Sequence, residues 1–166
     1  MKTGYTGFMK TILMLIAMYS NANGLDPYLV AGLIKTESSF NTKAVGGIGE
    51  IGLMQLRPEF FAEPDLGPIY KTKTPSFLKG TIAEIKEKDL FDPETNIRKG
   101  TAFLRQLKKS CPFKDDVQFV ICFNRGVRGA RNVSVPQEDP YYKKVSANRE
   151  HFKSQNIFTD TVIGSL

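Results

Sequence analysis

The sequence predicts a predominantly helical, all-α domain with a cleft. Two aspartate-proline pairs, Asp26-Pro27 and Asp92-Pro93, place a good N-cap before a proline at the first helical position. Behind each pair, apolar residues recur every three or four positions, as on the buried side of a helix. The chain has 166 residues, which is enough for one domain with its own core.

Residues 1–23 allow two interpretations. The stretch TILMLIAMYSNA after Lys10 resembles a secretory signal, with a basic start, a short apolar run and small residues at its end. It equally suits the first helix of the domain. It is too short and too weakly apolar for a transmembrane helix, so we expect no integral membrane span.

The helix that begins at Pro27 carries one candidate catalytic acid. Val30, Ile34 and Glu37 share one side of this helix, so Glu37 lies in line with the buried stripe. Partial burial disfavours the charged form and raises the pKa, which lets a glutamate keep a proton near neutrality and donate it. The alternative is an exposed glutamate at the end of a helix.

A glycine-rich turn follows the acid. Its glycines allow the backbone to approach a ligand closely. After them the chain returns to the core through Leu53, Met54 and Leu56, with Gln55 a lone amide that must be satisfied or face a cleft. The polar residues that end the helix and the glycines of the turn are Ser38, Ser39, Asn41, Gly46, Gly47, Gly49 and Gly52.

Residues 57–90 are interrupted by four prolines and predict a long loop, with a helical stretch only at about 81–88. Its aromatic residues either pack on sugar rings or form the local core of the loop. They are Phe60, Phe61, Tyr70 and Phe77.

Two further helices follow. The first runs from Asp92 to Lys109, with Asn96 expected to be structural and Gly100 expected at a close helix crossing. Asp115 or Asp116 caps the second, which stops at Gly126.

Cys111 and Cys122 are compatible with a disulfide. Cys122, however, lies within an apolar helix, and free cysteine is among the most buried residue types. We therefore expect two reduced, buried thiols.

Composition and charge exclude several classes of function. His151 is the only histidine and lies near no motif, so no histidine-based nucleophilic pair, metal cluster or cofactor is expected. The net charge of +6 favours an anionic partner. Because the basic residues are scattered, we expect no nucleic acid partner.

Three stretches together resemble one known family over residues 24–145. The first is ESSF at 37–40 with GEIGLMQL at 49–56, the second is FDPETNI at 91–97 with Gly100, and the third is FNRG at 123–126. They are similar to the motifs of the soluble lytic transglycosylases, the SLT domain of the lysozyme-like superfamily. Phe123 departs from the family's usual tyrosine, so a phenol is missing there.

The resemblance implies a lysozyme-like catalytic domain over 24–152, with residues 153–166 as a C-terminal tail. The family normally has a helix before this turn, which favours the structural helix for 1–23. The implied activity is cleavage of the β-1,4 bond between N-acetylmuramic acid and N-acetylglucosamine in peptidoglycan, with a 1,6-anhydromuramyl product. Glu37 alone would act as acid and then as base, because the sugar's own 6-hydroxyl is the nucleophile.

The resemblance also implies a set of site residues. Ser38 and Gln55 are expected to contact the saccharide or position the acid, Met54 to shape the cleft floor, and Asn124 to contact the saccharide. Tyr141 is expected to orient Glu37, because Val145 completes the family's pattern, with Tyr142 as the competing assignment.

Two other functions stay open. Glu50 stands where animal-type lysozymes have an acid, so Glu37 and Glu50 could form a hydrolase with two carboxylates. A wall-binding or assembly protein without turnover is the second alternative. Each of the three readings takes peptidoglycan glycan strands as partner, and we expect a monomer in the periplasm or cell wall, secreted or phage-delivered.

Overall fold

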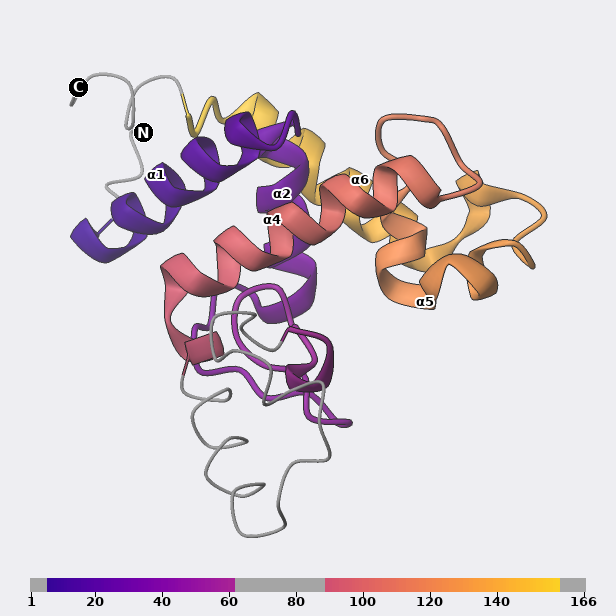
Figure 1. The fold of residues 1–166 in the computed structure, drawn as a ribbon. Coiled ribbons are helices and arrows are strands. Elements are labelled where there is room, and N and C mark those ends of the chain that lie inside the picture. Colours follow the sequence, from indigo (N-terminus) through magenta and orange to yellow (C-terminus); the bar gives the residue numbers. More distant parts are fainter. Residues whose placement is uncertain (1–5, 62–88, 159–166) are drawn as a thin grey trace, which may run out of the picture.

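The computed structural model describes residues 6–61 and 89–158. Within these ranges the chain forms helices joined by loops, with isolated bridges from Ile51 to Val45 and Leu56 in place of strands. The predicted all-α fold is therefore confirmed. The elements are α1 (Gly7–Ala22), α2 (Pro27–Ser38), η1 (Pro58–Phe60), α4 (Pro93–Ser110), α5 (Val120–Ala130), η3 (Pro136–Glu138) and α6 (Pro140–Ser154), as Figure 1 shows.

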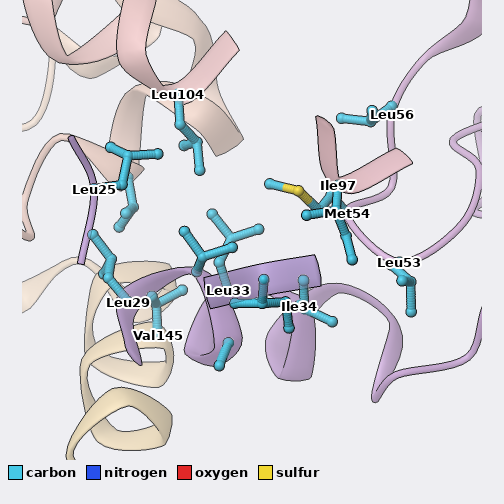
Figure 2. Close-up of a cluster of buried hydrophobic side chains, with 14 of the residues drawn as sticks. Leu25, Leu29, Leu33, Ile34, Leu53, Met54, Leu56, Ile97, Leu104 and Val145 are labelled. Carbon is cyan, nitrogen blue, oxygen red and sulfur yellow. The ribbon is translucent and has the colours of Figure 1, made fainter. Parts of the chain in front are cut away.

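Helix α2 forms the centre of the core. Asp26 caps it by accepting a hydrogen bond from the backbone N–H of Tyr28 at 2.9 Å. Its apolar side chains pack between those of α4, α6 and the loop after residue 50, and Figure 2 shows this cluster. The labelled members are Leu25, Leu29, Leu33, Ile34, Leu53, Met54, Leu56, Ile97, Leu104 and Val145.

Helices α2 and α6 cross with their backbones in contact at Gly32. A Cβ atom on Gly32 would lie 2.8 Å from the backbone nitrogen of Arg149 and 2.9 Å from the carbonyl oxygen of Val145. Only a residue without a side chain allows this approach. Arg149 also donates to the carboxylate of Asp26 at 2.6 Å, which fixes the same pair of helices.

Helix α1 packs on α4 and α2 through buried Ile12, Leu13 and Ile16. Polar contacts reinforce this packing, because the Tyr19 hydroxyl donates to Glu94 at 2.7 Å. Residues 7–22 are thus helical and part of the core, and their retention in the mature protein stays a prediction. Among residues 6–61 and 89–158, no helix has the length and apolar character that crossing a bilayer requires.

Helix α4 fixes the glycine-rich turn through Asn96, which is buried. The amide oxygen of Asn96 accepts from the backbone N–H of Met54 at 2.9 Å, and its nitrogen donates to the carbonyls of Ile51 at 3.0 Å and Leu90 at 2.8 Å. Gly100 does not mark the helix crossing that its position suggested. It makes room for Met54, whose sulfur would lie 2.3 Å from a Cβ at this position.

A disulfide joins Cys111, at the end of α4, to Cys122 in α5, with an S–S distance of 2.06 Å. The expectation of two reduced thiols was therefore wrong. Both residues are buried, as expected, but the turn between them brings their Cα atoms to 6.1 Å, within disulfide range. Asp115 stabilises that turn by accepting from the backbone N–H groups of Val117 and Gln118.

The helical run of α5 is interrupted at Gly126, which has a φ of 69° and a ψ of 162°. Figure 1 shows α5 at the end of α4 that lies away from the loop after α2. Beyond residue 152, where a tail was expected, α6 continues to Ser154 and the chain buries Ile157 and Phe158. Tyr70 and Phe77 lie outside the described residues.

Candidate active site

A cleft of about 720 Å³ opens beside the C-terminal end of α2. The glycine-rich turn and η1 form one part of its wall, and α4 and α5 form another. Its lining includes the four sequence-predicted residues Glu37, Glu50, Gln55 and Asn124. The fold therefore brings together side chains that are up to 87 positions apart in the sequence.

Glu37 lies half-buried in the last turn of α2, one turn after the fully buried Ile34. Burial raises the pKa of Glu37 above its ordinary value, and the negative charge of Glu50 raises it further. The hydrogen bond from Tyr141 and the positive charge of Lys144 act in the opposite direction. Because burial is the largest effect, this carboxyl group holds its proton to a higher pH than an exposed glutamate.

The hydroxyl of Tyr141 donates a hydrogen bond to Oε1 of Glu37. Burial raises the pKa of Tyr141 well above its ordinary value, and the charge of Glu37 adds to this effect. The phenol therefore stays protonated and acts as a donor. Of the two candidate tyrosines, the structure places Tyr141, and not Tyr142, on the acid.

Asp139 positions the start of α6, and sequence reasoning missed it. Its carboxylate caps the helix by accepting from the backbone N–H of Tyr142 at 3.0 Å, and it also accepts from Nε of Arg125 at 2.8 Å. It is only 4% exposed. The signal was available, since Asp139-Pro140 repeats the aspartate-proline pair that opens α2 and α4.

Ser38 and Met54 do not line the cleft. The hydroxyl of Ser38 donates to the carbonyl of Leu53 at 2.8 Å and lies 3.2 Å from the carbonyl of Ile34, so it ties the returning loop to α2. Met54 is fully buried against Gly100. Both residues support the wall of the cleft from within the protein.

Gln55 and Glu50 line the cleft from the glycine-rich turn. The side-chain nitrogen of Gln55 donates to the carbonyls of Gly52 at 3.0 Å and Ala44 at 3.3 Å, so this amide group is held in place. The carboxylate of Glu50 accepts from the backbone N–H of Ile48 at 3.1 Å. The cleft thus contains a second carboxylate besides Glu37.

The α5 side of the cleft is aromatic and polar. Asn124 is exposed and lines the cleft. Phe123, which replaces the tyrosine of the motif, packs its ring 5.9 Å from that of Phe103. Phe103 in turn contacts Phe61 edge to face at 5.2 Å, so the phenyl group keeps the packing without a hydroxyl.

Within the described residues, no three His, Cys, Asp or Glu side chains gather where they could hold a metal ion. The chemistry that the arrangement supports is proton transfer by a half-buried acid, with a tyrosine hydroxyl orienting it.

The chain is similar in sequence to known transglycosylases. Over 96 residues the chain is 35% identical to the membrane-bound lytic murein transglycosylase C of Mannheimia succiniciproducens, a match that covers 58% of this chain and 24% of that protein. Over 82 residues it is 35% identical to the transglycosylase of Enterobacteria phage PRD1, covering 49% of this chain and 23% of the phage protein. The chain thus spans about a quarter of the length of these curated relatives.

A solved structure of an inactive mutant of the lytic transglycosylase Slt from Pseudomonas aeruginosa has the same fold. The TM-score is 0.63 at 19% identity, and the match covers 89% of this chain and 24% of that chain. Residues 14–140 match the family of the transglycosylase SLT domain, which confirms the resemblance seen in the three motifs. Since this match covers more than half of the sequence, the chain belongs to the transglycosylase SLT domain family.

Proposed function

We propose that this protein is a lytic transglycosylase that cleaves the β-1,4 bond between N-acetylmuramic acid and N-acetylglucosamine in peptidoglycan. The observation that carries the proposal is Glu37, a half-buried acid at the wall of the cleft that accepts a hydrogen bond from Tyr141. The family match and the names of the relatives support the same reaction.

In the first step, the protonated carboxyl group of Glu37 donates its proton to the glycosidic oxygen as the bond to C1 of the muramic acid breaks. The raised pKa of Glu37 keeps the proton available for this step. The departing sugar leaves with a 4-hydroxyl group, and positive charge develops on the muramic acid ring.

In the second step, the Glu37 carboxylate takes the proton from the 6-hydroxyl of the same muramic acid, whose oxygen bonds to C1. The 1,6-anhydro ring forms, no water is consumed, and Glu37 returns to its protonated form. The hydroxyl of Tyr141 stabilises the intermediate carboxylate by donating to it. One carboxylate is therefore sufficient.

The other cleft residues have supporting roles in this proposal. Asn124 is exposed in the cleft and contacts the saccharide, whereas Gln55 shapes the turn beside the acid. The net charge of +6 attracts the carboxylates of the stem peptides. The protein acts as a monomer on the wall, in the periplasm or at the cell surface, after secretion or phage delivery.

A second candidate function is hydrolysis of the same bond by two carboxylates. The observation that favours it is Glu50, which lines the same cleft and whose charge raises the pKa of Glu37. In that mechanism Glu50 would stabilise the cation or activate a water molecule, and the product would be a reducing end.

A third candidate is a wall-binding protein without turnover. The intact pair of Glu37 and Tyr141 argues against it, since binding alone needs no acid with a raised pKa.

Mass spectrometry of the products from purified sacculi distinguishes the three functions. The wild type is compared with Glu37→Gln and Glu50→Gln variants, and pelleting with sacculi measures binding. Anhydro-muropeptides that disappear with Glu37→Gln and persist with Glu50→Gln support the transglycosylase. Products one water heavier that are lost in both variants overturn it in favour of the hydrolase. Pelleting without any released product supports the binding protein.

A further inference from the structure

Phe60 is an aromatic side chain that lines the cleft and is 69% exposed. Single exposed apolar residues are common on protein surfaces, so exposure by itself is no sign of a site. Three further observations distinguish Phe60: the turn that carries it is fixed, one face of its ring is covered by a cation, and the charge of that cation is compensated.

The turn η1 is fixed to α4. Pro58 begins it, and the backbone N–H of Phe60 donates to the carbonyl of Arg57 at 3.0 Å. At its end, Phe61 packs edge to face on Phe103 of α4, and Nζ of Lys99 donates to the Phe61 carbonyl at 2.9 Å. The backbone that carries the Phe60 ring is therefore held in place before any ligand binds, which lowers the entropic cost of binding.

The guanidinium of Arg57 lies over the ring of Phe60, with its central carbon 5.0 Å from the ring centroid. Arg57 also forms an ion pair with Glu59, so its positive charge is balanced within the turn. The ring thus has one face supported by Arg57, and its exposed surface is open to the cleft. A surface of this kind binds a flat apolar face without requiring a charge on the ligand.

We propose that Phe60, supported by Arg57, is a stacking platform for a pyranose ring of the glycan strand. A β-linked N-acetylated sugar presents axial C–H groups on one face, and these complement the negative face of an aromatic ring. The inference rests on the proposed function, because it assigns the ligand of a second part of the same cleft. It predicts that an uncharged oligosaccharide of N-acetylglucosamine is sufficient to occupy the platform.

The sequence offers a direct spectroscopic test, because it contains no tryptophan. A Phe60→Trp variant, made together with Glu37→Gln to prevent turnover, carries a single indole on the platform. Titration with chitotetraose is expected to shift or quench its emission. The matched control is Phe8→Trp in the same background, since Phe8 is 58% exposed on α1 and lies outside the cleft lining, and its emission is expected to stay constant.

Calorimetry supplies the second measurement. In the Glu37→Gln background, Phe60→Ala is expected to weaken binding of chitotetraose by about 3- to 10-fold, the range of aromatic contact energies, whereas Phe8→Ala leaves it unchanged. Circular dichroism shows whether each variant is folded. The increase in the Kd for chitotetraose that Phe60→Ala causes should be the same at low and high salt, because the charge of Arg57 is balanced within the turn.

The outcomes separate the two proposals. The inference is overturned, with the proposed function intact, if Phe60→Ala binds as tightly as its parent and the Phe60→Trp emission does not respond. It is equally overturned if chitotetraose binds to no variant while the wild type still digests sacculi. If the wild type neither binds chitotetraose nor digests sacculi, the proposed function is wrong, and the role of Phe60 that rests on it is wrong as well.

Discussion

Replacing Gly32 with alanine should separate the two helices that carry Glu37, the candidate catalytic acid, and Tyr141. The new Cβ would lie 2.8 Å from the backbone nitrogen of Arg149. Relieving this contact to about 3.4 Å, an ordinary van der Waals distance, requires a movement of about 0.6 Å. Because the neighbouring atoms belong to the backbone of α6, no side chain can rotate to make room.

The energetic cost follows from two opposing effects. Overpacking a well-packed contact typically costs about 1–3 kcal/mol, and alanine in a helix returns up to about 1 kcal/mol relative to glycine. We expect a net destabilisation of about 1–2 kcal/mol, which lowers the melting temperature by about 2–8 °C for a chain of this size.

The same movement affects function, since α2 carries Glu37 and α6 carries Tyr141. We expect the rate of sacculus digestion to fall by more than the unfolded fraction explains. Gly7→Ala is the matched control, because Gly7 also lies in a helix and its Cβ would meet no atom within 4 Å. Urea unfolding and turbidity of sacculi measure the two effects. A Gly32→Ala variant that is as stable and as active as the wild type would refute the reasoning.

Three further predictions concern the acid, the disulfide and the start of α6. Tyr141→Phe removes the hydrogen bond that lowers the pKa of Glu37, so the pKa of Glu37 should rise. The alkaline limb of the pH-rate profile should then move to higher pH while the maximal rate falls. An unchanged alkaline limb would contradict the role of Tyr141 in orienting Glu37. Reduction of the Cys111–Cys122 disulfide should destabilise the protein by about 3 kcal/mol, as measured by urea unfolding with and without reductant. A variant with alanine at both positions should unfold at the same urea concentration whether or not reductant is present. Asp139→Asn removes the charge of a buried carboxylate that pairs with the partly exposed Arg125, and it should cost about 1 kcal/mol in the same assay. A cost no larger than that of a surface substitution would show that the pair contributes little.

Local chemistry made the helices and the position of Glu37 predictable. Asp26 and Asp92 cap their helices through their own side chains, and these bonds need no distant partner. Glu37 was predictable because its helical spacing alone places it beside the buried stripe. Gly126 likewise interrupts the helical run with a positive φ that glycine adopts easily, although α5 resumes and continues to Ala130.

Long-range geometry explains what sequence reasoning missed. The Cys111–Cys122 disulfide depends on how the turn after α4 folds back, and spacing does not reveal this. The roles of Ser38 and Met54 could not be read from their motif, because their partners, Leu53 and Gly100, are set by the packing of the loop on α2 and α4. The motifs therefore predicted which segments lie at the cleft more reliably than which of their side chains face it.

The buried amide of Asn96 affects the order in which the candidate active site assembles during folding. It binds Met54 and Ile51, which lie more than 40 positions earlier in the chain, so the wall beside Glu37 is completed by a contact of high sequence separation. Such contacts form only after the intervening chain has closed, and they are slow steps in folding. The first 61 residues contain the acid and the glycine-rich turn, yet they lack the group that holds this turn. The amide proton of Met54 should consequently resist hydrogen exchange in the folded domain and lose that protection in a fragment that ends before α4.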